Sequence, residues 1–356
     1  MAVCLATGLN HTIARRRDGT VWTWGDGSNG QLGLDDPTMT VRRVPTQVPG
    51  ISSAREVEGG WSTSFVRTAE GLVRACGWHL AGQLGRPATE PQISFRPVLR
   101  FRRPRTVSAG SFHCLATYKS QVYAWGMNLR GGFGIGSGSV GDIWVYPRPL
   151  PGVDGVTRAV AGLFGQSFLL RRSGPRLLAA GLNNHGQLGD GTTQDRTEFV
   201  AIPGMSDVVA IETGNAYTLA LLDDGTVWAW GLNDVGQLGD GTRVSSLTPV
   251  RVGQLRRIVA ISAGYSHALA LDDAGRVSER GHVVDNVFFD VRSAPVKVEI
   301  PRPVVAIAAG YTFSHAVDDN GDVWGWGVNG EGQVGTGSTA LRVPEPTRLD
   351  GISQVG

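Results

Sequence analysis

Residues 209–242, VAIETGNAYTLALLDDGTVWAWGLNDVGQLGDGT, contain a pattern that recurs along the chain and decides the fold. Three short runs rich in Val, Ile, Leu and aromatic residues are separated by turns that contain Gly, which is typical of β-strands. Asp224-Gly225 joins the second and third runs, and this pair favours a two-residue type I′ hairpin turn with positive φ at both positions. A later run that carries Pro, Leu247 to Val252, fits a fourth strand at an outer edge. The stretch predicts a small antiparallel sheet of four strands.

Seven such units follow one another at a period of about fifty residues. In each unit a short apolar run ends in a glycine, and these glycines are Gly8, Gly60, Gly110, Gly162, Gly214, Gly264 and Gly310. A second glycine closes the third run of each unit, at Gly25, Gly77, Gly126, Gly181, Gly231, Gly281 and Gly327. The units therefore start near residues 2, 54, 105, 156, 208, 258 and 304.

The two ends of the chain indicate how the row of units closes. The last unit stops at LDGISQVG, residues 349–356, just before a further apolar run is due, and the chain begins with that run, AVCLATG, residues 2–8. Seven sheets form either a ring or an open stack, and an open stack needs polar caps that the sequence lacks. We therefore expect residues 1–356 to form one all-β, seven-bladed propeller of four-stranded antiparallel blades. Its ends complete one blade or a blade junction.

The repeated motifs resemble those of the regulator of chromosome condensation repeat family, in the style of its bacterial members. AGYSHALAL at 263–271, DGTVWAWGLNDVGQLG at 224–239 and NGDVWGWGVNGEGQVG at 320–335 match the family's pattern in register. The resemblance implies a propeller that acts through protein contacts. Its members include an exchange factor for a small GTPase, a plant photoreceptor and propellers that inhibit β-lactamases.

The repeated tryptophans and histidines are predicted to be structural. Alternation puts Trp228 and Trp230 on one face of their strand, where indoles can fill the space between blades. Other units carry smaller or charged pairs, and the sequence offers no physical reason for these departures: Arg74/Cys76, Leu178/Ala180 and Ser278/Arg280. Three units carry a histidine at the same position: His11, His113 and His267. Because these residues lie around the ring and do not converge on one point, we expect them to form hydrogen bonds to the backbone and not a metal site.

Composition and charge narrow the function. The 33 Lys and Arg residues against 31 Asp and Glu give a formal net charge of +2, so we expect neither nucleic acid nor a membrane as a partner. A local cluster is interpreted as protection of a sheet edge: Arg96, Arg100, Arg102, Arg103 and Arg105. The three cysteines have no C-x-x-C spacing, which argues against a disulfide framework or a cysteine-rich zinc site. The N-terminus has no signal-peptide pattern and no window reaches eighteen apolar residues, which favours a cytoplasmic protein.

Signals for catalysis are weak. Residues 136–141, GSGSVG, fit G-x-G-x-x-G, but a dinucleotide site needs that string inside a βαβ unit, and none is predicted. The sequence contains no Walker lysine, no G-x-S-x-G elbow and no calcium-loop spacing. We therefore expect no enzyme activity, no cofactor and no bound metal.

The loops that follow the first glycine of each unit are the expected binding surface. Five of them carry aromatic residues, the composition of interface hot spots: Trp61, Phe112, Phe164, Tyr265 and Tyr311. The alternative is that some of these side chains fold inward and seal the central channel. The Gly-rich extension at 127–147 adds Phe133 and Trp144 as candidate contacts. The sixth unit, with Phe288 and Phe289, is interpreted as a drifted repeat.

The prediction for function is a monomeric, non-enzymatic propeller that binds another protein through one loop face, as an adaptor, regulator or inhibitor. Two alternatives remain open. One is guanine-nucleotide exchange on a small GTPase, and the other is binding of a glycan or small ligand by the aromatic surface.

Overall fold

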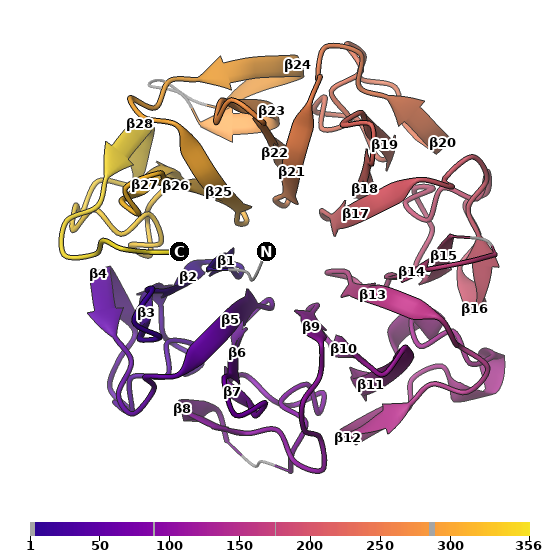
Figure 1. The fold of residues 1–356 in the computed structure, drawn as a ribbon, viewed down its shortest axis with the longest axis horizontal. Helices are drawn as coiled ribbons and strands as arrows, with labels where there is room; N and C mark the ends of the chain where they lie inside the picture. Colours follow the sequence, from indigo (N-terminus) through magenta and orange to yellow (C-terminus); the bar gives the residue numbers. More distant parts are fainter. Residues whose placement is uncertain (1–3, 88–89, 175, 285–288) are drawn as a thin grey trace.

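A computed structural model describes residues 4–87, 90–174, 176–284 and 289–356. In that part of the chain, 28 strands form seven four-stranded antiparallel sheets, each built from four consecutive strands. Figure 1 shows these sheets as blades around a central axis, with the first strand of each blade innermost and the fourth at the periphery. The predicted seven-bladed propeller is confirmed, as are its four-stranded blades.

The strands have the following bounds. Blades 1 and 2 contain β1 (Leu5–Thr7), β2 (His11–Arg15), β3 (Val21–Asp26), β4 (Val41–Gln47), β5 (Ala54–Gly59), β6 (Thr63–Thr68), β7 (Val73–Gly77) and β8 (Gln92–Pro97). Blades 3 and 4 contain β9 (Thr106–Ala109), β10 (His113–Tyr118), β11 (Gln121–Met127), β12 (Ile143–Pro149), β13 (Val156–Ala161), β14 (Ser167–Arg171), β15 (Leu177–Gly181) and β16 (Arg196–Ala201). Blade 5 contains β17 (Val208–Thr213), β18 (Tyr217–Leu222), β19 (Val227–Gly231) and β20 (Ser246–Arg251). Blades 6 and 7 contain β21 (Ile258–Ala263), β22 (His267–Asp272), β23 (Val277–Val284), β24 (Phe289–Val298), β25 (Val304–Ala309), β26 (Phe313–Asp318), β27 (Val323–Val328) and β28 (Arg342–Arg348). Two 3₁₀ turns, η1 (Leu129–Gly131) and η2 (Ser137–Ser139), lie between β11 and β12.

The ring closes at a blade junction rather than within a shared blade. All four strands of blade 1 come from the N-terminal part of the chain. The C-terminal segment instead pairs with the β2–β3 hairpin, because Arg17 N donates to Gln354 O at 2.9 Å. Val355 N donates to Gly321 O of blade 7 at 3.1 Å, so the same segment joins the first and last blades. The second of the two sequence alternatives is therefore correct.

The turn predicted at Asp224-Gly225 is wrong by one residue. Gly225 has a φ of 76°, whereas Asp224 does not have a positive φ. Gly225 N donates to Leu222 O at 3.1 Å and Leu222 N donates to Thr226 O at 2.9 Å, which makes a three-residue loop with a left-handed glycine. The cause lies in the Asp224 carboxylate, which accepts hydrogen bonds from the backbone and hydroxyl of Thr226 at 2.9 and 2.7 Å.

The second tryptophan of three motifs seals the space between neighbouring blades. The indoles of Trp24, Trp125 and Trp230 are fully buried. Each Nε1 donates to the backbone oxygen of a glutamine in the preceding blade, at 3.0, 2.8 and 2.9 Å: Gln333, Gln83 and Gln187 respectively. Each indole thus packs against the G-Q-L-G or G-Q-V-G segment of the blade before it.

A phenylalanine from the fourth strand replaces the indole where Cys76 or Ala180 stands in its position. A Cβ on Gly189 would lie 2.7 Å from Trp230 Nε1, but at the equivalent Gly33 it would lie 2.4 Å from the Phe95 side chain. At Gly134 the corresponding neighbour is Phe199, at 2.3 Å. Phe95 lies on β8 and Phe199 on β16, so an outer strand fills the gap that the sequence left unexplained.

The sixth blade replaces the indole contact with charged side chains. Arg280 is fully buried, and its Nε donates to Gln237 O at 3.2 Å. Blade 6 lacks the G-Q-L-G segment whose glutamine backbone oxygen accepts the indole N–H at other junctions. At the junction with blade 7, Glu279 Oε1 accepts the Trp326 Nε1–H instead, at 3.0 Å. These substitutions keep both junctions hydrogen-bonded, which favours the interpretation of blade 6 as a drifted repeat. Phe288 lies outside the described residues.

Three histidines bond to a side chain in the next blade rather than to the backbone. The pairs His11–Ser64, His113–Ser167 and His267–Ser314 have Nε2···Oγ distances of 2.9, 2.8 and 2.9 Å. Ser64 Oγ donates its proton to Gln31 O at 2.7 Å, so His11 Nε2 must be the donor of this pair. These histidines therefore join blades and lie apart from one another around the ring.

We expect Trp230→Phe to lower the free energy of unfolding by about 2 kcal/mol, because it removes the hydrogen bond to Gln187 O and leaves a small cavity. Trp228→Phe is the matched control, since Trp228 is only partly buried and its Nε1 has no hydrogen-bond partner. It should cost less than about 0.5 kcal/mol. Urea unfolding followed by circular dichroism measures both, and equal losses would contradict the assigned role of the second indole.

Candidate functional site

The two faces of the propeller carry different kinds of loop. Because strands alternate in direction, the links between first and second strands lie on the same face as the links between third and fourth strands. We call this the long-loop face, since it carries links such as 128–142 and 232–245. The opposite side, the hairpin face, carries the β-hairpins between second and third strands and the connections between blades.

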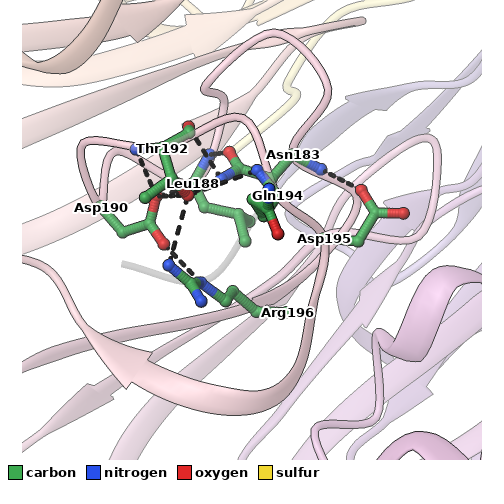
Figure 2. Close-up of polar contacts among 7 residues, drawn as sticks. All are labelled: Asn183, Leu188, Asp190, Thr192, Gln194, Asp195 and Arg196. Atoms are coloured by element: carbon green, nitrogen blue, oxygen red, sulfur yellow. Dashed lines mark hydrogen bonds and ion pairs between the residues drawn. The ribbon is translucent and has the colours of Figure 1, made fainter.

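Hydrogen bonds inside the long loop of blade 4 hold its shape. Figure 2 shows Asn183 at the centre of this loop. Its Nδ2 donates to Asp190 Oδ1 and Thr192 O, both at 3.0 Å, and its Oδ1 accepts the Leu188 N–H at 2.9 Å. Arg196 Nε lies 2.6 Å from Asp190 Oδ2. Burial opposes ionisation of Asp190, but bonds from Arg196 and Thr192 lower its pKa overall. With the bond from Asn183 N to Asp195 Oδ1 at 2.8 Å, these contacts tie the start of the loop to its middle and its end.

Four of the predicted aromatic residues meet over the central axis. We call Trp61, Phe164, Tyr265 and Tyr311 the aromatic cluster. Their ring centroids are 5.5 Å apart for Trp61–Phe164, 6.4 Å for Phe164–Tyr265, 4.2 Å for Tyr265–Tyr311 and 6.2 Å for Tyr311–Trp61. All four side chains are half-buried. The residues therefore converge rather than spread along a rim, and they come from blades 2, 4, 6 and 7.

Backbone hydrogen bonds between successive blades fix three of the four turns that carry the aromatic cluster. Tyr265 N donates to Tyr311 O at 3.3 Å and Tyr311 N to Leu9 O at 3.3 Å. Leu9 N donates to Trp61 O at 2.9 Å, and Asn215 N donates to Tyr265 O at 3.0 Å. Blades 5, 6, 7, 1 and 2 are linked in this way, so Trp61, Tyr265 and Tyr311 have little conformational freedom to lose on binding a partner.

Phe112 lies on the same face but outside the cluster. Its ring packs on Trp78 at 6.3 Å, and it is half-buried. Trp78 follows the second glycine of its unit, Gly77, and opens the long loop of blade 2. The sequence prediction did not include it, although its place directly after that glycine was a usable signal.

Phe133 is not a surface residue, which corrects its place among the predicted contacts. Its side chain is fully buried, and its N–H donates to Asn128 Oδ1 at 2.8 Å, as the Leu188 N–H does to Asn183 Oδ1. The segment GGFG at 131–134 therefore occupies the position that G-Q-L-G occupies in other blades. Trp144 on β12 is half-buried and packs on Phe133 with centroids 4.9 Å apart.

A cavity of about 410 Å³ runs along the axis and contains charged groups that the sequence prediction missed. Glu58, Arg158 and Glu212 line it, and Arg158 Nη2 lies 3.2 Å from Glu212 Oε1. Burial, and then the neighbouring Glu212 and Glu56, raise the pKa of Glu58 to about 8. Burial also raises the pKa of Glu212 despite Arg158. A carboxylate two residues before the first glycine of its unit, as in REVEGG and VAIETG, was the available signal.

The described residues contain no group of three His, Cys, Asp or Glu side chains placed to hold a metal ion. In the same ranges, no helix is long and apolar enough to cross a membrane. Whether the protein uses a cofactor or a metal stays a matter of the sequence prediction.

Known proteins share both the repeats and the fold. Models of the regulator of chromosome condensation (RCC1) repeat match residues 18–67, 176–221, 224–271 and 320–355, and a second model of this repeat matches 2–31, 208–237 and 304–333. The human E3 ubiquitin-protein ligase HERC2 is 32% identical over 231 residues, 62% of this chain and 5% of HERC2. The bovine secretion-regulating guanine nucleotide exchange factor is 28% identical over 171 residues, 43% of this chain and 36% of that protein.

The fold agrees with a solved structure of low sequence identity. Prp20p from Saccharomyces cerevisiae superposes with a TM-score of 0.80 at 22% identity, over 97% of this chain and 86% of that one. The chain spans well under half the length of the two curated relatives named above. The repeat matches, which together cover more than half of the sequence, identify this chain as a member of the regulator of chromosome condensation (RCC1) repeat family.

Proposed function

We propose that this protein is a non-enzymatic adaptor, regulator or inhibitor that binds another protein through its long-loop face, as a single propeller. The observation that carries the proposal is the aromatic cluster, in which four half-buried rings from four blades contact one another at the centre of that face. Aromatic side chains held in place before binding are typical anchors of protein interfaces, because they bury a large area at a low cost in conformational entropy.

Exposed apolar side chains on the surrounding loops support the same face. Several large aliphatic residues in the links between third and fourth strands are more than 45% exposed: Leu80, Val140, Val244 and Leu341. Phe112 with Trp78, and Trp144, add aromatic area around the cluster. Together with the aromatic cluster, these apolar groups favour a protein partner for the long-loop face.

Alanine substitutions test the proposed interface. Trp61→Ala and Tyr265→Ala are expected to weaken capture of the partner by tenfold or more, about 1.4 kcal/mol or above, with little change in melting temperature. Leu99→Ala is the control, because Leu99 is 39% exposed but lies in the link between β8 and β9 on the hairpin face. Affinity purification from native extract followed by mass spectrometry measures capture. Equal weakening by Leu99→Ala, or a loss of stability parallel to the loss of binding, would overturn the proposal.

Guanine-nucleotide exchange is the second candidate, favoured by the similarity to the bovine exchange factor. Release of a labelled nucleotide from a panel of small GTPases distinguishes the two. A scaffold leaves the release rate unchanged, whereas an exchange factor raises it in proportion to its concentration.

A further inference from the structure

We propose that the axial cavity binds one alkylammonium cation, held by Glu58 and Glu212 against the inner side of the aromatic cluster. Trp61, Tyr265 and Tyr311 line the same cavity as the two carboxylates. The proposal concerns the interior of the propeller and stands apart from the protein interface on the long-loop face.

The charged groups that line the cavity do not balance. They are two carboxylates, Glu58 and Glu212, and one guanidinium, Arg158, so ionisation of all three leaves one net negative charge. Arg158 pairs with Glu212 at 3.2 Å. Glu58 accepts one long hydrogen bond, from Ala109 N at 3.3 Å, and no cation of the described chain forms an ion pair with it. A ligand with a single positive charge would bring the net charge of the cavity lining and ligand to zero.

Burial and the unbalanced negative charge both raise the pKa of Glu58. Burial first, and then the charges of Glu212 and Glu56, raise the pKa of Glu58 to about 8, and Arg158 opposes this effect. The nearby Glu56 is already paired with Arg67 at 2.8 Å and does not line the cavity. Burial raises the pKa of Cys4 and of Tyr265, which also line the cavity, so neither adds a negative charge near neutral pH. Glu58 is thus the group that a cation would ionise.

The aromatic cluster selects the kind of cation. Rings attract cations over their faces within about 6 Å of the centroid, and quaternary ammonium groups are bound in this way. Of the rings that line the cavity, Trp61 and Tyr311 meet at an interplanar angle of 77° and Tyr265 and Tyr311 at 49°, so they stand at an angle to one another rather than in a flat stack. A divalent metal needs several oxygen ligands, and the lining offers only two carboxylates, one of them paired. An organic ammonium ion fits this combination better.

The cavity has room for such a ligand and an opening separate from the long-loop face. Its volume of about 410 Å³ lies in the range of small-molecule sites. Val259 and Val305, near the start of β21 and β25, line its other end and are 54% and 48% exposed. A small cation can therefore enter from the hairpin face and stop against the aromatic cluster.

Calorimetry of the full chain with choline tests the proposal. We expect one site per chain with a Kd below about 10 mM, and binding at least tenfold weaker for the neutral isostere 3,3-dimethylbutan-1-ol. Potassium chloride at the same concentration should not compete beyond its effect on ionic strength. Glu58→Gln should reduce choline affinity at least tenfold, whereas the matched variant Glu56→Gln should leave it unchanged. Melting temperatures confirm that both variants fold, and if Glu58→Gln does not fold, the comparison of choline with its isostere on the native chain still decides.

The pH dependence gives a second, independent readout. The cation binds the ionised form of Glu58, so choline affinity should rise with pH between pH 6 and 8 and level off above that range. Binding at pH 7 should release a proton, which calorimetry detects as a heat that depends on the buffer. Glu58→Gln should abolish both effects. Equal binding of choline and its isostere, no binding of choline, or an affinity independent of pH would overturn the proposal, and none of these results would bear on the protein interface.

Discussion

Deletion of residues 352–356 is expected to lower the free energy of unfolding by about 5 kcal/mol. Ile352 and Val355 are 4% and 0% exposed and pack in one cluster with Trp24, Val323 and Leu349. Burying each aliphatic side chain contributes about 2 kcal/mol, and the backbone hydrogen bonds of this segment contribute about 1 kcal/mol more. The loss is large because the segment joins blades 1 and 7 and the ring has no other covalent or strand-paired closure at that junction among the described residues.

Urea unfolding of the shortened chain measures this effect. Val355→Ala is a smaller version of the same change and should cost about 2 kcal/mol. Ser353→Ala is the control, because Ser353 is only half-buried and its side chain takes no part in that cluster. A shortened chain as stable as the full one would show that the blades hold together without this closure.

Acid is expected to destabilise the protein because four buried histidines resist protonation. Burial lowers the pKa of His11, His113, His267 and His315 from the usual 6.5 to about 4. The Nδ1 atoms of His11, His113 and His315 are buried without a hydrogen-bond partner. A proton added to Nδ1 when the imidazole becomes charged would therefore have no hydrogen-bond acceptor. The unfolded chain takes up these protons below pH 6.5, whereas the folded chain does not until about pH 4. The stability from each histidine is therefore complete above pH 6.5 and is lost as the pH falls toward 4.

His113→Gln isolates one of these contributions. Between pH 7.5 and 4.5 the native protein should lose roughly 2–3 kcal/mol more stability than the variant, because in this range the unfolded chain protonates His113 and the folded chain does not. Glu58 acts in the opposite direction, because burial raises its pKa, but it is common to both chains. His185→Gln is the control substitution, since the His185 side chain is exposed. Parallel curves for His113→Gln and the native chain would refute the assignment.

Much of the fold could be predicted because the determining signals are local and repeated. Each unit shows its strands by apolar runs and its turns by glycines, and seven copies average out the errors of any one. The turn at Asp224-Gly225 was missed by one residue, because the competing bond from the Asp224 side chain to Thr226 is not visible in the dipeptide preference. The replacement of an indole by Phe95 or Phe199 could not be predicted, because it depends on which fourth-strand residue reaches the neighbouring blade.

The candidate site could be predicted in its residues but not in its arrangement. The sequence singled out Trp61, Phe164, Tyr265 and Tyr311 by their shared position after a glycine. Whether they spread along a rim or meet at the axis depends on side-chain directions in four separate blades. The Glu58 carboxylate was overlooked because a charged residue of one inner strand indicates a site only when other blades bring Arg158 and Glu212 to the same cavity.

Photo-crosslinking tests the proposed protein interface most directly. A photoreactive phenylalanine analogue is placed at position 112 on the long-loop face or at position 99 on the hairpin face, and each protein is irradiated in native extract. We predict a discrete crosslinked protein from position 112 that is absent from position 99 and is lost when Tyr265→Ala is added. The same product from position 99 alone would contradict the assignment of the long-loop face.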